Sequence, residues 1–318
     1  MRPIRSTLVL SLLALSLLVA ACGDDPVTPT VSGPTATTGP STSFPVTITD
    51  DDGESVTIDA PPQRIVTFAP SMTEIVFALG LGDELVGVSG PFDDYPSEAA
   101  DIEEVGGAGD FGVDPNIEQV VGLEPDLFLT IKGGDQWKRR LRDLDVPVVT
   151  LDATNLDDLM DDFEVAGQIT GAEDAATAVV DDLQAQADEV ESAIAGTPRV
   201  TCFYETFYPP LYTVGPGTFI YDLLERAGCD PVTSSAGQQY PQWSVEDLVD
   251  QSPDVYLVST ESGAGPKAVA KRAGFEAIAA VATGRVVVID SNLAERPGPR
   301  IIEGLRLIAE ALHPEAFD

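Results

Sequence analysis

Residues 172–194 read AEDAATAVVDDLQAQADEVESAI, a stretch that contains neither glycine nor proline. Small and apolar side chains recur along it at helical spacing, which predicts a single helix about 30–35 Å long. The positions that set this spacing are Ala176, Val179, Val180, Leu183, Ala187 and Val190. Strand and helix patterns alternate on both sides of the stretch without an internal Gly/Pro linker. We therefore expect this helix to join two lobes.

The sequence before the long helix alternates between strand and helix patterns. Residues 46–58, with Asp51-Asp52-Gly53 at their centre, predict a β-hairpin. After a buried strand at 64–68, Pro70-Ser71 begins a helix in which Ser71 and Glu74 form a predicted capping box. Further strands are predicted at 85–88, 126–129 and 146–151, and further helices at 117–123 and 137–144.

A second series of the same kind follows the long helix. Strands are predicted at 200–204, 255–259 and 286–289, and helices at 219–227, 245–250 and 301–312. Alternating elements of this kind form parallel sheets that helices cover on both faces. We expect an α/β protein with two Rossmann-like lobes, parallel-rich sheets and a ligand cleft between the lobes. The expected boundaries are 44–170 for the first lobe, 171–197 for the linking helix and 198–318 for the second lobe.

The N-terminus has the pattern of an exported protein. Two arginines precede an apolar stretch, residues 8–21, that is too short to span a membrane and fits a signal peptide over 1–21. Leu18-Val19-Ala20-Ala21-Cys22 resembles the bacterial lipobox, in which the chain is cut before a cysteine that then carries lipid. Residues 22–43 are rich in Pro, Thr, Ser, Gly and Asp, which favours a flexible stalk. We expect a lipid-anchored protein on the extracytoplasmic face of the cell membrane.

Composition excludes several classes of function. The net charge is −36, from 53 acidic and 17 basic residues, which argues against nucleic acid as a partner. The single histidine, His313, ends the last predicted helix, so a zinc site with several histidines is excluded. The sequence contains no G-x-S-x-G motif and no P-loop. We expect no catalytic residues, no metal and no cofactor; a membrane-tethered hydrolase that uses a carboxylate pair is the alternative from another class.

Two cysteines remain beside Cys22. Cys202 and Cys229 would lie in an oxidising compartment, which permits a disulfide. The sequence leaves the bond open, because it does not show whether the two Cβ atoms meet.

Aromatic residues follow the ends of several predicted strands. They are Phe92, Tyr95, Phe111, Trp137, Phe207, Tyr208, Tyr212, Tyr240 and Trp243. Ligands of α/β sheets bind beyond the carboxyl ends of strands, so aromatics from both lobes predict a cleft for a large, partly apolar ligand. Ordinary loop packing is the alternative for each of them taken singly.

Several motifs resemble those of class III periplasmic-type binding proteins, the cobalamin and iron-siderophore receptors of ABC importers. RIVTFAPSMTE at 64–74 is similar to the start of that family's fold, and Asn116-Ile117-Glu118 and Leu123-Glu124-Pro125-Asp126-Leu127 match a later motif. Tyr240-Pro241-Gln242 and Glu295-Arg296-Pro297-Gly298-Pro299-Arg300 resemble motifs of the cobalamin-binding members. The likeness extends over nearly all of residues 64–312.

The resemblance implies a receptor that delivers cobalamin to the permease and ATPase of an ABC importer. Glu118 and Glu246 match the glutamate of each lobe that docks on permease arginines, and a monomer is expected. The matching ligand-binding positions are Phe92, Phe111, Tyr212, Tyr240, Asn292 and Arg296, with Asn292 standing where an acidic residue is expected. The alternative ligands are an iron-siderophore or haem. The cleft loops offer few cations, namely Lys132, Arg296 and Arg300, which favours a near-neutral ligand over an anionic ferric catecholate.

Overall fold

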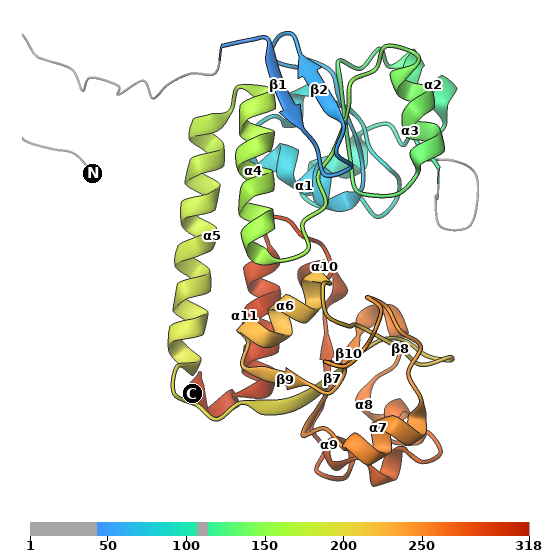
Figure 1. Cartoon of the computed structure of the whole chain (residues 1–318), viewed down its shortest axis with the longest axis vertical. Helices are drawn as coiled ribbons and strands as arrows, with labels where there is room; N and C mark the ends of the chain where they lie inside the picture. Colours follow the sequence, from blue (N-terminus) through green and yellow to red (C-terminus); the bar gives the residue numbers. More distant parts are fainter. Residues whose placement is uncertain (1–42, 107–113, 318) are drawn as a thin grey trace, which may run out of the picture. The chain divides into compact units, whose positions relative to one another are not determined.

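The computed structural model describes residues 43–106 and 114–317 of the chain. The predicted signal peptide, Cys22 and most of the stalk lie outside the described residues, as does Phe111. The long helix α5 runs from Glu173 to Ile194, close to its predicted bounds, and both lobes lie along it (Figure 1).

The N-terminal lobe contains a hairpin and a four-stranded sheet. The hairpin strands β1 (Val46–Thr49) and β2 (Ser55–Ile58) are antiparallel. The sheet has the order β4-β3-β5-β6, and all of its strands are parallel. These strands are β3 (Ile65–Phe68), β4 (Leu85–Gly87), β5 (Leu127–Thr130) and β6 (Val148–Thr150). Every residue of β3, β5 and β6 is buried, as expected for strands covered on both faces.

The helices of this lobe are α1 (Pro70–Ala78), α2 (Ile117–Gly122), α3 (Asp135–Arg142) and α4 (Leu156–Thr170), with 3-10 turns η1 (Gly82–Glu84) and η2 (Ser97–Asp101). The predicted capping box of α1 is wrong. The N-cap residue is Ala69, and no side chain caps the helix. Since Pro70 occupies the first helical position, the helix begins two residues earlier than a cap at Ser71 predicts, and Ser71 and Glu74 face the interior.

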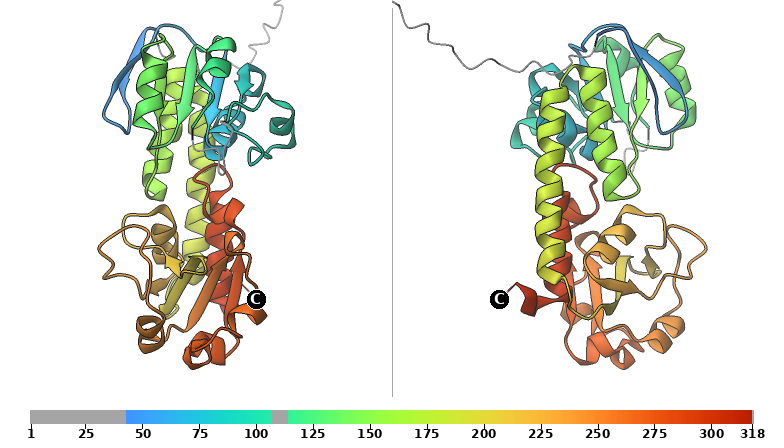
Figure 2. Two further views of the ribbon diagram at one scale, coloured as in Figure 1. Left: turned by 90° about the vertical axis from the view of Figure 1, so that its right-hand side faces the viewer. Right: turned by 60° about the vertical axis from the view of Figure 1, so that its left-hand side comes forward.

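Helix α4 was not predicted, although Leu156, Leu159, Phe163 and Ala166 recur at helical spacing. Asn155 caps it, accepting a hydrogen bond from the Asp158 N–H at 2.9 Å. The helix packs on α5 (Figure 2). A Cβ at Gly167 would lie 2.5 Å from the Cβ of Ala176, so glycine permits this close approach. The two lobes are therefore connected by a pair of packed helices.

The C-terminal lobe has a five-stranded sheet in the order β11-β10-β7-β8, with β9 also paired to β7. The strands are β7 (Val200–Phe207), β8 (Tyr212–Thr213), β9 (Cys229–Pro231), β10 (Val255–Ser259) and β11 (Val286–Ile289). All pairs are parallel except β7 with β8. Around this sheet lie α6 (Phe219–Arg226), α7 (Val245–Gln251), α8 (Pro266–Val269), α9 (Ala279–Ala282), α10 (Ser291–Ala294) and α11 (Ile301–Leu312). Three 3-10 turns complete the lobe: η3 (Thr260–Ser262), η4 (Phe275–Ala277) and η5 (Pro314–Ala316).

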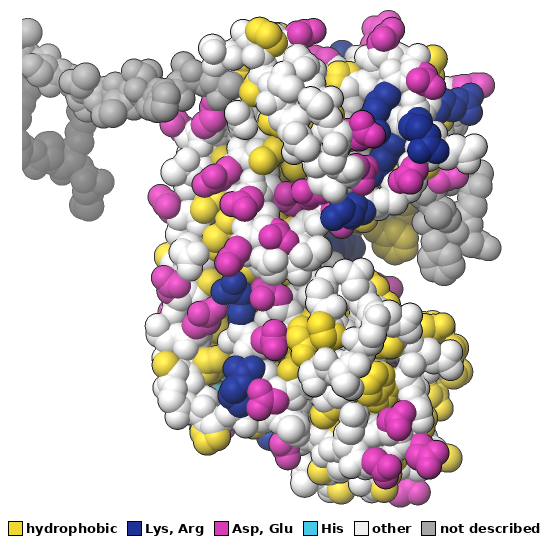
Figure 3. Space-filling view, viewed as in Figure 1, with side chains coloured by type: hydrophobic (Ala, Val, Ile, Leu, Met, Phe, Trp, Pro, Cys, Tyr) yellow, Lys and Arg dark blue, Asp and Glu magenta, His cyan; other side chains and the backbone are white. Residues whose placement is uncertain are grey.

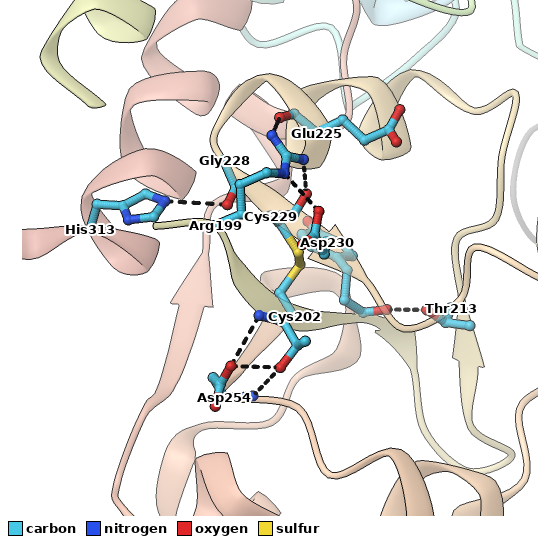
Figure 4. The surroundings of a disulfide bond; sticks show 11 residues. Arg199, Cys202, Thr213, Glu225, Gly228, Cys229, Asp230, Asp254 and His313 are labelled. Atoms are coloured by element: carbon cyan, nitrogen blue, oxygen red, sulfur yellow. Dashed lines mark hydrogen bonds and ion pairs between the residues drawn. A yellow bond between two sulfur atoms is a disulfide. The ribbon is translucent and has the colours of Figure 1, made fainter. Parts of the chain in front are cut away.

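A disulfide joins two neighbouring parallel strands of this lobe. Cys202 on β7 bonds to Cys229 on β9, with Cα atoms 5.8 Å apart (Figure 4). Both residues are fully buried. The buried ring of His313 lies beside the same strands, with Nε2 3.3 Å from the carbonyl oxygen of Gly228. The bond that the sequence left open is thus formed in the structure, and the histidine has a packing role at the end of α11.

One apolar core continues from the N-terminal sheet through α4 and α5 to the C-terminal sheet and α11. The lobes also meet through polar contacts at the start of α4, where the Leu156 N–H donates to Asp222 and Asp157 pairs with Arg226 at 2.8 Å. None of the helices in the described part of the chain is both long and apolar enough to cross a membrane.

Candidate ligand-binding cleft

A cleft of about 380 Å³ is lined by residues of both lobes. Figure 3 shows the surface hollowed between them. The N-terminal lobe contributes residues that follow the carboxyl ends of β3, β5 and β6, together with Asp162 of α4. The C-terminal lobe contributes the start of α6 and the segments 239–240 and 295–297. This volume lies within the range of small-molecule sites, and the position beyond the strand ends is the usual one for α/β folds.

The charged groups that line the cleft are mostly acidic. Lys132 and Arg296 are the cations among the described lining residues, and Asp152, Asp162 and Glu295 are the carboxyl groups. Burial raises the pKa of Asp152 and of Glu295, and it raises the pKa of Asp162 to about 8. No group of three or more His, Cys, Asp or Glu in the described residues is arranged to hold a metal ion.

An ion-pair network joins α1 of the N-terminal lobe to the segment before α11. Arg300 donates two hydrogen bonds to the buried carboxylate of Glu74, at 2.6 and 2.9 Å. Arg296 lies 3.8 Å from Glu74 and 3.3 Å from Asp94. The guanidinium of Arg300 also stacks on the ring of Tyr95, 3.8 Å from its centroid. Arg296 therefore pairs with two residues of the N-terminal lobe.

The loop that carries Phe92 is held in place by a buried aspartate. Asp93 accepts hydrogen bonds from the hydroxyls of Thr73 and Ser89 and from the N–H of Gly90, the last at 3.0 Å. The neighbouring Phe92 is 61% exposed. Because Asp94 contacts Arg296, which lines the cleft, Phe92 stands on a loop beside the cleft without lining it.

The segment that carries Tyr240 is held by backbone hydrogen bonds to the region of β8. Gly215 N–H donates to Gln239 at 2.7 Å, and Thr213 N–H donates to Pro241 at 3.1 Å. Tyr240 itself lines the cleft and is 57% exposed. Tyr212, which forms an isolated bridge with Gln242, is half-buried and does not line the cleft.

The cleft lining therefore includes Tyr240 and Arg296 of the predicted ligand-binding residues. Phe92, Tyr212 and Asn292 lie outside the lining, and Phe111 lies outside the described residues. The three carboxyl groups of the lining, Asp152, Asp162 and Glu295, are not among the predicted ligand-binding residues. Asp152 follows β6, and its position after a predicted strand is a usable signal, whereas Asp162 lies on α4, a helix that was not predicted.

The prediction that Trp137 faces the cleft is wrong. Gly134 adopts a positive φ of 71° and α3 begins at Asp135, two residues earlier than expected. Trp137 consequently lies in the first turn of α3 and packs in the core against Phe68 and Phe128, with ring centroids 5.5 and 5.7 Å apart.

The two predicted docking glutamates occupy equivalent local positions. Glu118 lies in the first turn of α2 after its N-cap Asn116, and Glu246 lies in the first turn of α7 after its N-cap Ser244. Both side chains are exposed, one on each lobe. A glutamate in the first turn also interacts favourably with the helix dipole.

Comparisons with known proteins agree with this architecture. Residues 65–293 match the periplasmic binding protein family. An uncharacterized ABC transporter substrate-binding lipoprotein of Bacillus subtilis is 33% identical over 317 residues, which covers 96% of each chain. A cobalamin-binding protein of Halobacterium salinarum is 34% identical over 285 residues, covering 85% of this chain and 75% of the relative.

Among solved structures, a possible iron-binding, periplasmic solute-binding protein from Staphylococcus epidermidis is similar, with a TM-score of 0.71 and 29% identity. The match covers 80% of this chain and all of the other. The predicted family and two-lobed α/β fold are thereby confirmed. Both lobes line one cleft, as expected for a protein that captures a small molecule. Because of the matched region and the similarity to the Bacillus subtilis relative, the chain belongs to the periplasmic binding protein family and is a substrate-binding protein of the ABC-transporter type.

Proposed function

We propose that this protein captures a corrinoid of the cobalamin type and delivers it to an ABC importer. The observation that carries the proposal is a cleft with an exposed tyrosine and few cations, in a chain 34% identical to a cobalamin-binding protein. A corrinoid is larger than the 380 Å³ cleft, so it would extend beyond the lining residues. The loop with Phe92 and Tyr95 and the segment with Tyr240 offer exposed aromatic surface for that part of the ligand.

The proposal includes docking of the loaded protein on a permease. Glu118 and Glu246 would each pair with an arginine of the partner, and two separated charge pairs would fix the orientation of the complex. Neither glutamate lines the cleft, which separates docking from ligand capture.

The proposal also places the protein on the extracytoplasmic face of the membrane, anchored through lipid on Cys22. The motif at 18–22 supports this location, as does the similarity to a relative that is named a lipoprotein. Tethering by lipid and a stalk would keep the receptor near its permease.

Calorimetric titration of cyanocobalamin into the purified full-length chain tests the ligand. We expect saturable binding at micromolar or lower concentration, weakened about tenfold in Tyr240→Ala, the loss of roughly 1.4 kcal/mol. Phe207→Ala is the matched control, because Phe207 is also an exposed aromatic of the C-terminal lobe and does not line the cleft. Absence of any heat up to a hundred micromolar would contradict the corrinoid assignment.

An iron-siderophore or haem is the second candidate ligand. Similarity to the possible iron-binding protein of Staphylococcus epidermidis favours an iron-containing ligand. Titration of an uncharged ferric trihydroxamate and of haem under the same conditions separates these ligands from the corrinoid by relative affinity.

Transport by cells that carry the cognate permease tests docking. We expect Glu118→Ala/Glu246→Ala to bind ligand as the unmodified protein does but to lose most uptake. Glu124→Ala/Asp250→Ala is the control, since it removes two other carboxylates from exposed positions of the same two lobes. Full uptake by the first double variant would contradict the docking role.

A further inference from the structure

The cations that line the cleft already have partners within the protein. Lys132 lies 3.7 Å from the carboxylate of Asp152. Arg296 lies 3.3 Å from Asp94 and 3.8 Å from the buried Glu74. An anionic ligand would therefore have to compete with protein carboxylates for each cation in the described lining.

Two carboxyl groups of the cleft lining are each held in position by a hydrogen bond. Asp162 on α4 is 6% exposed, and its Oδ2 accepts a hydrogen bond from the Ala153 N–H at 3.1 Å. Glu295, from the opposite lobe, accepts a hydrogen bond from the buried hydroxyl of Tyr204 at 2.8 Å. The cleft thus has a fixed carboxyl group on each side, and neither forms an ion pair within the described residues.

We propose that Asp162 and Glu295 are specificity-determining residues that make the cleft select ligands without net negative charge. This inference rests on the proposed function and deepens it, since it names the charge class of the ligand. Uncharged ligands rich in amide groups satisfy such a cleft, because a carboxyl group accepts hydrogen bonds when ionised and also donates one when protonated.

Selection against anions should strengthen as pH rises. The groups that face Asp162 are Asp51 from the β1–β2 turn, Asp152 after β6 and Asp158 on α4, with Lys132 after β5 on the same wall. Burial, and then repulsion from these aspartates, raises the pKa of Asp162 to about 8. Above that pH the side chain becomes an additional negative charge in the cleft wall.

A pair of ligands that differ by one charge tests the inference. Cyanocobalamin has no net charge, and its monocarboxylic acid, with one propionamide hydrolysed, has nearly the same shape and one negative charge. For the unmodified full-length chain we expect the acid to bind about tenfold more weakly at pH 9, a difference of roughly 1.4 kcal/mol. At pH 6 the difference should be smaller. In Asp162→Asn/Glu295→Gln the ratio of affinities should approach one at both values of pH.

Asp161→Asn is the control variant. Asp161 is the exposed neighbour of Asp162 on α4 and does not line the cleft, so a carboxyl group is removed beside Asp162 while the cleft wall is unaltered. Its ratio of affinities for cyanocobalamin and the monocarboxylic acid should equal that of the unmodified protein at both values of pH. The inference would be overturned if the unmodified protein bound the two ligands equally at pH 9. It would also be overturned if Asp162→Asn/Glu295→Gln and Asp161→Asn gave the same ratio.

Failure of the proposed ligand is distinguishable from failure of this inference. If cyanocobalamin does not bind, the same comparison is made with an uncharged ferric trihydroxamate and a ferric tricatecholate of charge −3. Preference for the trihydroxamate, lost in Asp162→Asn/Glu295→Gln, would support charge selection while refuting the corrinoid. Preference for the tricatecholate would overturn charge selection.

Discussion

Helix α1 of the N-terminal lobe and strand β7 of the C-terminal lobe each bury a glutamate, and the two are neutralised in different ways. Glu205 on β7 is fully buried and pairs with Arg272 of its own lobe. Glu74 on α1 is 2% exposed and pairs with Arg300 and Arg296 of the other lobe. Since a buried charge is costly without a partner, the first glutamate stabilises one lobe internally, whereas the second is satisfied only when the lobes are together.

The partners of Glu205 all belong to the C-terminal lobe. Its carboxylate accepts hydrogen bonds from Arg272, at 2.9 Å for Nη2, and from the hydroxyls of Tyr256 and Ser262. Arg272 stacks on Tyr208, 3.9 Å from the ring centroid. Burial opposes ionisation of Glu205, but the hydrogen bonds from Arg272, Ser262 and Tyr256 outweigh it and lower its pKa. The network joins β7 to β10 and to the segment that contains η3 and α8.

The largest effect in this comparison is expected for Glu205→Ala. The substitution leaves Arg272 without its partner in a buried position, which should cost about 3–5 kcal/mol of unfolding free energy. Tm should fall by about 10 °C, as measured by calorimetry. Glu205→Leu/Arg272→Met should recover a large part of the loss, because no unpaired charge remains. A change in Tm below about 2 °C for Glu205→Ala would contradict the role of the network.

The disulfide is expected to have the next largest effect. Cys202→Ser/Cys229→Ser opens a link between residues separated by 27 positions, and the chain-entropy account gives about 3.5 kcal/mol for a loop of that length. Tm of the double variant should therefore fall somewhat less than that of Glu205→Ala. Addition of reductant to the unmodified protein under denaturing conditions, followed by thiol titration, should release two thiols from this pair. A Tm equal to that of the unmodified protein would show that the bond does not stabilise the lobe.

Replacing Glu74 should lower the unfolding free energy less than replacing Glu205 does, but it should change ligand affinity more, because Glu74 links the two lobes. Glu74→Gln weakens the bonds to Arg300 and Arg296, whose side chains are 17% and 15% exposed and gain hydration when released. We expect a loss of about 1–3 kcal/mol and a shift in ligand affinity, because Arg296 lines the cleft. Glu205→Gln is the matched variant and should lower Tm more while changing affinity less. The contrast between the two glutamates fails if both variants change Tm and affinity alike.

The contrast also explains what the sequence predicts and what it does not. The strands at 65–68, 255–259 and 286–289 and the helix at 301–312 were predicted close to their observed bounds, since apolar runs and helical spacing are local signals. The two-residue strand β8 and the three-residue strand β9 have no such signal and exist through pairing with β7.

The partners of Glu74 lie outside the reach of sequence reasoning. Glu74 and Arg300 are 226 positions apart, so no local pattern connects them. A local pattern instead favoured a capping box at Ser71 and Glu74, because their spacing matches that motif. With Pro70 at the first helical position, the helix starts two residues earlier than a cap at Ser71 predicts, and the glutamate faces the interior. The role of Asp162 is likewise not visible in the sequence, because it comes from the burial of this side chain on α4 and from its hydrogen bond with Ala153 in the loop after β6.

The smallest expected effect concerns Asp162, and its sign depends on pH. The folded-state pKa of about 8 lies above the ordinary value of 3.8, so between these values the folded protein retains a proton that the unfolded chain has lost. Stability should therefore fall as pH rises from about 4 to 8. Asp162→Asn removes the titrating group and keeps an acceptor for the Ala153 N–H. We expect the variant to gain about 1–2 kcal/mol of unfolding free energy at pH 8, which is a rise in Tm of a few degrees, and to gain less at pH 5.

The control variant is Asp161→Asn, which should leave the pH profile of Tm unchanged because Asp161 is exposed. A profile for Asp162→Asn that runs parallel to that of the unmodified protein would mean that this carboxyl is ionised at neutral pH, and that the wall of the cleft carries its charge throughout.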